Sequence, residues 1–258
     1  MERELEVALK AARDAANAIR IIYDSEAYRV EQKSGGRGPL TDADLASNRI
    51  LLTALAKAFP EDGLLSEESR DDRSRLERSR VWIVDPLDGT REFTLGVPEF
   101  VVSVALVQDE RPVLGVLHNP ATGEVITGVE GRGVTYSGEP AHTTHHPAIE
   151  GARFLVSRSE HGKGWFEPYE GIAKLTPMGS VAYKLGLVAV GRAEATFTPK
   201  PRNEWDLAAG VACVLAGGGR ATNGAGEPYR FNQPDPLHIG VCGTNGALHD
   251  AVLGMMRR

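Results

Sequence analysis

The stretch VWIVDPLDGT, residues 81–90, decides how the rest of this sequence is interpreted. Its first four residues are apolar and mostly β-branched, which predicts a buried strand. Pro86 has a fixed φ and no backbone N–H, so the strand should end in a tight turn. Such a turn can direct the carboxylates of Asp85 and Asp88 and the carbonyl of Leu87 into one pocket, where hard oxygen ligands suit Mg²⁺. Taken by itself, the stretch is equally consistent with a turn of no chemical function, because all these residue types form turns.

Three other acidic stretches have ready structural explanations when each is taken alone. The pair Glu67-Glu68 is typical of a solvated surface. Asp206 lies in the stretch WDLAAG, where an acid in the first turn of a helix complements the helix dipole. Thr41 and Asp44 have the spacing of a capping box, although Glu is more usual than Asp at the last position. Only the combination of these stretches with residues 81–90 points to a site.

Hydrophobic periodicity divides the chain into helices and strands. Apolar residues recur at helical spacing near the N-terminus, and apolar segments separated by turn-forming spacers after residue 100 predict antiparallel hairpins. The glycine-rich stretch Lys33–Pro39 predicts a loop, either a lid over a site or an inert surface loop. The polar stretch 136–150 is the best boundary between two lobes. The expected helices cover 4–23, 41–59, 180–190 and 205–216, and the expected strands cover 81–84, 100–107, 111–118, 124–129, 154–156 and 195–197.

Composition and charge exclude several classes of protein. A chain of 258 residues with 41% hydrophobic residues can bury a core without disulfides. The net charge of −6 argues against binding of nucleic-acid polymers, but it permits a small anionic substrate in one locally cationic cleft. Cys213 and Cys242 lack the spacing of zinc or redox motifs. Residues 1–20 lack the apolar core of a secretory signal, and no apolar run approaches the roughly 18 residues of a membrane span, so we expect a cytoplasmic protein.

The order of the motifs resembles the inositol monophosphatase superfamily over nearly the whole chain. The motifs are LTDAD at 40–44, SEE at 66–68, WIVDPLDGT at 82–90 and WDLAAG at 205–210. The resemblance implies an α/β fold, a five-layer αβαβα sandwich. It also implies phosphomonoester hydrolysis with two or three Mg²⁺ ions, often inhibited by Li⁺, and a homodimer. We expect an N-terminal α+β lobe over 1–140 that carries most metal ligands, and a C-terminal α/β lobe over 141–258 that carries Asp206 and the specificity residues.

The resemblance also implies metal ligands at the matching positions. Glu67, Asp85 and the Leu87 carbonyl are expected to bind one metal. Asp85, Asp88 and Asp206 are expected to bind a second, with Asp85 bridging the two. Such a cluster of like charges is unfavourable unless cations neutralise it or some carboxyls keep their protons.

Other matching positions are expected to act on water and phosphate. Asp44 and Thr90 resemble the pair that orients and activates the attacking water. Gly89 and Thr90 offer backbone N–H groups to the phosphate. Glu68 is a further candidate for contact with a metal-bound water. The sequence contains no P-loop and no cysteine nucleophile motif, so a covalent intermediate is not expected.

Residues outside the shared motifs bear on the choice of substrate. Animal-type inositol monophosphatases carry a substrate-binding glutamate seven residues before the W-D aspartate, where this chain has Pro199. Lys200 and Arg202 follow it, and with Ser180 and Lys184 they form a candidate site for a second phosphate. Ordinary surface charges are an alternative for each of these cations.

Longer stretches resemble the bacterial CysQ-type 3′(2′),5′-bisphosphate nucleotidases. They are residues 65–76, VWIVDPLDGTREF at 81–93, and FNQPDP at 231–236. This resemblance implies hydrolysis of 3′-phosphoadenosine 5′-phosphate to AMP and phosphate, a step that clears a by-product of sulfate assimilation. The alternatives are an inositol monophosphatase, a dual inositol and fructose 1,6-bisphosphate phosphatase, or a silent metal or nucleotide sensor on the same fold. The residues alone assign no chemical role to Asn232–Pro236.

Overall fold

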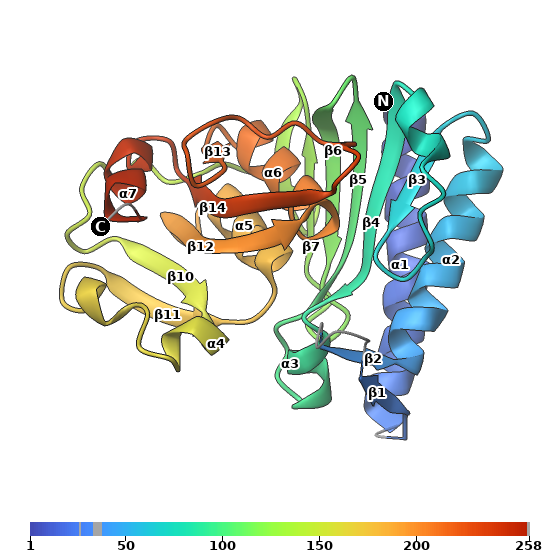
Figure 1. Ribbon diagram of the computed structural model, residues 1–258, viewed down its shortest axis with the longest axis horizontal. Coiled ribbons are helices and arrows are strands. Elements are labelled where there is room, and N and C mark those ends of the chain that lie inside the picture. The colour runs from blue at the N-terminus through green and yellow to red at the C-terminus, as the bar shows by residue number, and fades with distance from the viewer. Residues whose placement is uncertain (26, 33–37, 257–258) are drawn as a thin grey trace.

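The computed structural model describes residues 1–25, 27–32 and 38–256. Helices and sheets alternate in five layers, in the order helices, sheet, helices, sheet, helix (Figure 1). This arrangement confirms the αβαβα sandwich expected from the motifs. Within the described residues, no helix is long and apolar enough to span a membrane.

The outer layer consists of α1 (Glu2–Ser25) and α2 (Asp42–Ala58), which lie side by side against the first sheet (Figure 1). The buried positions of α1 are mostly alanines, with Ile19 in its last turns. Small residues on this stripe let the helix approach the sheet closely. Both helices agree with the sequence periodicity.

The first sheet has seven strands in chain order, and β3 pairs in parallel with β4 while every other pair is antiparallel. Alternate residues of β4 face opposite layers, as a period of two requires. Trp82 and Val84 pack toward α1 and α2, whereas Val81 and Ile83 pack toward the middle of the molecule. The strands are β3 (Gly63–Ser66), β4 (Arg80–Asp88), β5 (Val101–Gln108), β6 (Arg111–His118), β7 (Val125–Val129), β8 (Gly133–Tyr136) and β9 (Glu139–Ala141).

The middle layer consists of α5 (Val181–Ala189) and α6 (Glu204–Ala216), which pack against each other. Helix α6 lies directly on β6 and β7 because two glycines leave room for its backbone. A Cβ at Gly115 would overlap the carbonyl of Ala209, and a Cβ at Gly128 would overlap Cys213. The position of α6 is therefore set by contact with the first sheet.

The second sheet has the strand order β11-β10-β12-β14-β13 and carries α7 (His249–Met256) on its far face (Figure 1). Strand β10 is parallel to both of its neighbours. The strands are β10 (Arg153–Ser157), β11 (Lys174–Met178), β12 (Ala195–Asn203), β13 (Arg220–Thr222) and β14 (Leu237–Thr244). Short elements complete the fold: β1 (Val30–Gln32), β2 (Pro39–Thr41), α3 (Thr90–Thr94), α4 (Arg158–His161), and the 3₁₀ helices η2 (Ser74–Glu77) and η3 (Glu167–Tyr169).

The structure adds strands that the sequence patterns did not predict. Strands β3, β8 and β9 lengthen the first sheet, and β9 lies inside the polar stretch 136–150 that we took as a lobe boundary. The first sheet ends at Ala141 and the second begins at Arg153. The division into lobes at residue 140 stays a prediction. The predicted glycine-rich loop falls largely on residues 33–37, outside the described residues.

Candidate active site

Strand β4 carries two acids to one end of the first sheet. Its pairing with β5 shifts register between Asp85 and Asp88, so the strand is irregular where Pro86 interrupts it. The backbone N–H of Leu87 donates to Oδ1 of Asp85 at 2.9 Å, which fixes the turn. Both aspartates are at least nine-tenths buried.

Asp206 approaches the same point from the first turn of α6. The backbone N–H of Asn203 donates to Oδ2 of Asp206 at 3.1 Å, so the helix start orients the carboxylate. The side chains of Asp85, Asp88 and Asp206 each have an oxygen within 4.8 Å of the others. Strand β4 and helix α6 thus bring together three acids that are far apart in the sequence.

Burial and the repulsion of neighbouring carboxylates raise the pKa values of Asp85 and Asp206 when no cation is bound. Burial raises the pKa of Asp85 well above its ordinary value, and the carboxylates of Glu67, Asp88 and Asp206 raise it further. Burial, with Asp88 and Glu67 adding to it, raises the pKa of Asp206 to about 8. Closely spaced carboxyl oxygens fit a hard divalent cation, which would displace the protons and relieve the repulsion between the carboxylates.

Asp44 and Thr90 form a hydrogen-bonded pair beside this acidic cluster. Oγ1 of Thr90 lies 3.0 Å from Oδ1 of Asp44 and 3.0 Å from the carbonyl oxygen of Leu87. The other oxygen of Asp44 accepts from the backbone N–H of Thr41 at 2.8 Å and from its hydroxyl at 2.5 Å. The predicted capping box exists, and the same aspartate also reaches Thr90.

The N-terminus of α5 holds Asp88 from the opposite side. Oδ2 of Asp88 accepts hydrogen bonds from the hydroxyl of Ser180 and the backbone N–H of Ala182, both at 2.7 Å. Ser180 has a φ of 52°, an unusual value for a residue with a side chain. The ammonium of Lys184 lies within 3.3 Å of the carbonyl oxygens of Met178, Gly179 and Ser180, and burial lowers the pKa of Lys184 to about 8.

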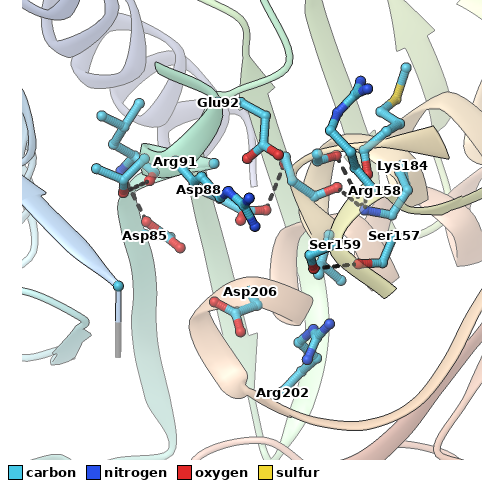
Figure 2. Close-up of a pocket in the computed structure, with 18 of the residues that line it drawn as sticks. Asp85, Asp88, Arg91, Glu92, Ser157, Arg158, Ser159, Lys184, Arg202 and Asp206 are labelled. Carbon is cyan, nitrogen blue, oxygen red and sulfur yellow. Dashed lines mark hydrogen bonds between the residues drawn. The ribbon is translucent and has the colours of Figure 1, made fainter. Parts of the chain in front are cut away.

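One cavity of about 330 Å³ contains most of the predicted site residues (Figure 2). Arg202 lines it and forms an ion pair with Glu160 at 2.7 Å. Asp44, Glu68 and Lys200 are not among the described residues that line the cavity; Asp44 lies behind Thr90, and the ammonium of Lys200 lies over the Trp165 ring at 4.1 Å. The predicted residues in the cavity wall are Glu67, Asp85, Leu87, Asp88, Gly89, Thr90, Ser180, Lys184, Arg202 and Asp206.

The cavity also contains polar residues that the sequence patterns did not single out. Arg91 and Glu92 follow Thr90 in α3, so their position directly after the motif was an available signal. Residues 157–159, Ser-Arg-Ser, lie where β10 ends and α4 begins (Figure 2). Ligands commonly bind at the carboxyl ends of parallel strands, but this signal needs the strand order, which the sequence does not give.

Comparison with known proteins agrees with this geometry. A family model described as the inositol monophosphatase family matches residues 1–257. The chain belongs to the inositol monophosphatase family. As a member of this family, it is a metal-dependent phosphoric monoester hydrolase.

Individual relatives in the family carry different activities in their names. A fructose-1,6-bisphosphatase/inositol-1-monophosphatase of Thermotoga maritima is 28% identical, over 96% of this chain and 94% of the relative. The 3′(2′),5′-bisphosphate nucleotidase CysQ of Escherichia coli K12 is 32% identical, over 88% of this chain and 93% of the relative. The solved structure of a Thermotoga maritima IMPase superimposes with a TM-score of 0.87 at 28% identity, over 100% of this chain and 97% of that one.

Proposed function

We propose that this chain is a Mg²⁺-dependent 3′(2′),5′-bisphosphate nucleotidase that hydrolyses 3′-phosphoadenosine 5′-phosphate to AMP and phosphate. The supporting observation is that acidic and cationic side chains line the same cavity, with Asp88 near Arg91 and Asp206 near Arg202 (Figure 2). The acids Asp85, Asp88 and Asp206 suit a metal and the phosphate that is cleaved. Arg91 and Arg202 offer a planar guanidinium to a second phosphate.

Sequence similarity favours the nucleotide over other phosphate esters. The CysQ relative matches at 32% identity, and its printed activity is that of a bisphosphate nucleotidase. Pro199 stands where a glutamate would contact inositol hydroxyls, which weakens the case for inositol. Lys184 is an unsuitable direct phosphate ligand in the conformation described, because its ammonium donates to three backbone carbonyls.

The donor set fits Mg²⁺. Carboxylate and carbonyl oxygens are the ligands this ion prefers, and the candidates Glu67, Asp85, Leu87, Asp88 and Asp206 all line the cavity. Two or three bound Mg²⁺ ions would supply an activated water and would neutralise the charge of the phosphoryl oxygens. The raised pKa values of Asp85 and Asp206 mean that binding is coupled to loss of protons from these carboxyls.

The chain's own residues orient the attacking water in this proposal. When the Thr90 hydroxyl donates to Oδ1 of Asp44, its oxygen can accept a hydrogen bond from a water in the cavity. As the water attacks phosphorus, it passes a proton to Oγ1 of Thr90, and the Thr90 hydroxyl passes its own proton to Asp44. The bond between phosphorus and the 3′ oxygen breaks, and that oxygen takes a proton from a solvent water to become the 3′ hydroxyl of AMP.

Measurement of phosphate release tests the proposed substrate. Purified protein with Mg²⁺ is supplied with 3′-phosphoadenosine 5′-phosphate, inositol 1-phosphate or fructose 1,6-bisphosphate at equal concentrations. We expect kcat/KM for the nucleotide to exceed the other values by about tenfold, a difference of roughly 1.4 kcal/mol in transition-state binding. An equally large preference for inositol 1-phosphate or fructose 1,6-bisphosphate would keep the metal chemistry and replace the substrate.

A dual inositol and fructose 1,6-bisphosphate phosphatase is the second candidate. The specific observation in its favour is the Thermotoga maritima relative with that printed activity, which aligns over 96% of this chain. The remaining parts of the proposal follow the family resemblance: a homodimer in the cytoplasm, inhibition by Li⁺, and service to sulfate assimilation. Size-exclusion chromatography tests the homodimer, and a Li⁺ titration of turnover tests the inhibition.

A further inference from the structure

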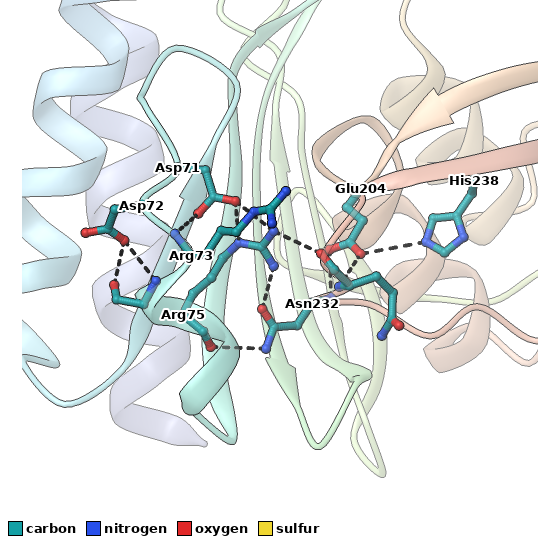
Figure 3. Close-up of polar contacts among 9 residues, drawn as sticks. Asp71, Asp72, Arg73, Arg75, Glu204, Asn232 and His238 are labelled. Carbon is teal, nitrogen blue, oxygen red and sulfur yellow. Dashed lines mark hydrogen bonds and ion pairs between the residues drawn. The ribbon is translucent and has the colours of Figure 1, made fainter.

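The segment 231–236, which had no assigned role from sequence, binds two other parts of the chain (Figure 3). Asn232, its second residue, has a φ of 62°. Oδ1 of Asn232 accepts from Nη1 of Arg75 at 2.7 Å, and Nδ2 of Asn232 donates to the Arg75 carbonyl at 3.2 Å. This reciprocal pair joins η2 to a segment 157 residues later in the sequence.

Arg75 is the buried centre of these contacts, with a side chain only 1% exposed. Its Nη2 donates to Oδ2 of Asp71 at 2.9 Å and to the Gln233 carbonyl at 3.0 Å, and its Nε also donates to Asp71. A buried guanidinium is strongly unfavourable unless its donors are paired. The pairing therefore fixes the relative positions of residues 71–75 and the segment 231–236.

Glu204 fixes the other side of the same segment to α6. This residue is the first of the helix and is fully buried. Its carboxylate accepts from the backbone N–H groups of Asn232 at 2.7 Å and Gln233 at 2.8 Å (Figure 3). Its own N–H donates to the Pro236 carbonyl at 2.8 Å, and Nε2 of His238 lies 3.9 Å from Oε1. The helix start is thus held by at least three hydrogen bonds to one segment.

The two ends of this chain of contacts lie on elements that lead to candidate metal ligands. Glu67 directly follows β3, and the first residue of that strand, Gly63, packs against Arg75 so closely that a Cβ there would lie 2.9 Å from Cβ of Arg75. Asp206 follows Glu204 by two residues in α6. Glu67 and Trp205 both line a second cavity of about 480 Å³, together with Asp71 and residues 234–236.

We propose that Arg75, Asn232 and Glu204 form a positioning network. This network sets the separation between Glu67, which follows β3, and the start of α6. The network touches neither substrate nor metal; it acts through Glu67 and Asp206. Glu67 follows β3, the edge strand of the first sheet, whereas α6 rests on β6 and β7, so the distance of Glu67 from Asp206 depends on further contacts between the residues after β3 and the start of α6. The inference rests on the proposed function, since it requires both acids to be metal ligands.

Direct titration of Mg²⁺ by calorimetry tests the network without relying on turnover. Asn232→Gly removes the amide but keeps the positive φ, because glycine adopts that conformation readily. Glu204→Gln replaces one acceptor oxygen with a donor that faces a backbone N–H. We expect the Kd for Mg²⁺ to rise about tenfold in each variant, while KM for the nucleotide at saturating Mg²⁺ stays near its original value. If Glu204→Gln does not fold, the Kd of Asn232→Gly for Mg²⁺ alone tests the network.

Glu194→Gln is the matched control. Glu194 is also a buried carboxylate that accepts a backbone N–H, from Arg153 at 2.5 Å, and it is not among the described residues that line either cavity. We expect this variant to lower Tm and to leave the Kd for Mg²⁺ unchanged. Network variants that lose Tm but bind Mg²⁺ as tightly as the original chain would overturn the proposal. Absence of Mg²⁺ binding by the original chain would overturn the proposed metal function and the network's role with it.

Discussion

Oγ1 of Thr90 lies 3.0 Å from Oδ1 of Asp44, although 46 residues separate the two in sequence. The remaining oxygen of Asp44 is occupied by the N–H and hydroxyl of Thr41. The Asp44 carboxylate therefore caps the N-terminus of α2 and also accepts a hydrogen bond from Thr90 in the cavity wall. The capping role of Asp44 and its predicted role in catalysis are compatible, because each would use a different oxygen.

Thr90→Val is expected to abolish most turnover while the fold persists. Valine keeps the branched shape but has no hydroxyl to pass a proton between water and Asp44, so kcat should fall by about 10²–10⁴-fold. Thr90→Ser restores the hydroxyl and should recover part of the loss. Steady-state kinetics at saturating Mg²⁺ measure the effect, and Tm is the control for folding. Turnover by Thr90→Val close to that of the original chain would remove Thr90 from the mechanism.

Lys200 and Arg202 are expected to differ in their effect on substrate choice. Arg202 lines the cavity, whereas the ammonium of Lys200 lies over Trp165. Arg202→Ala should therefore reduce kcat/KM for 3′-phosphoadenosine 5′-phosphate more than for 2′-AMP or another monophosphate, by about tenfold, the scale of a charge-assisted contact of roughly 1.5 kcal/mol. Lys200→Ala should leave the ratio of the two substrates unchanged. Equal losses for both substrates in Arg202→Ala would remove this residue from the specificity argument.

Mg²⁺ is expected to raise the Tm of the original chain and to have little effect on Asp88→Asn. An ion at about 100 times its Kd stabilises the folded state by roughly 2.7 kcal/mol when it binds only that state. Because the pKa of Asp206 lies at about 8, protons compete with the ion, so the increase in Tm should grow from about pH 6 to about pH 8. Thermal scans with and without Mg²⁺ at the two pH values measure this increase in Tm. A Tm that does not respond to Mg²⁺ would contradict the metal assignment.

His249 is expected to make the protein less stable in acid. The side chain is fully buried between the hydroxyls of Thr222 and Thr244, and burial lowers its pKa from 6.5 to about 4. His249 takes up a proton below pH 6.5 in the unfolded chain, but only below about pH 4 in the folded chain. Stability from this group is therefore complete above pH 6.5 and is lost as pH falls through that window, with a limiting slope of about 1.4 kcal/mol per pH unit.

Urea unfolding of the original chain and of His249→Gln measures this contribution. The free energy of unfolding is determined for both at about pH 7 and about pH 5. The difference between the two chains cancels the titration of other groups, including the acids of the cavity. The original chain should lose more stability than His249→Gln on acidification, and parallel losses would show that His249 titrates normally.

The sequence predicted most of the layers because periodicity and turn residues are local signals. The apolar stripe of residues 4–23 and the alternating strands after residue 100 need no partner to be recognised. Strand β11 was missed because Pro177 and partly exposed side chains make it unlike a core strand. Its existence depends on pairing with β10, which local patterns do not contain.

Site residues could be predicted where they are close together in the sequence, as in residues 81–90. They could not be predicted where their roles depend on partners that are distant in the sequence. The acids of residues 81–90 share one turn, and the structure brings Asp206 within reach of them. No pattern could show that the ammonium of Lys184 meets backbone carbonyls, since a buried lysine and a phosphate ligand look alike in sequence. The same holds for Asn232, whose partner Arg75 lies 157 residues away.

The glycines under α6 give the enzyme a property that none of its acids has. Because Gly115 and Gly128 have no side chains, the backbone of α6 packs directly on the first sheet. The helix cannot move away from this sheet without breaking that contact. We therefore expect α6 and the first sheet to move little relative to each other when a ligand enters or leaves the cavity. The missing side chains of Gly115 and Gly128, on β6 and β7, thereby help to place Asp206 near Asp85.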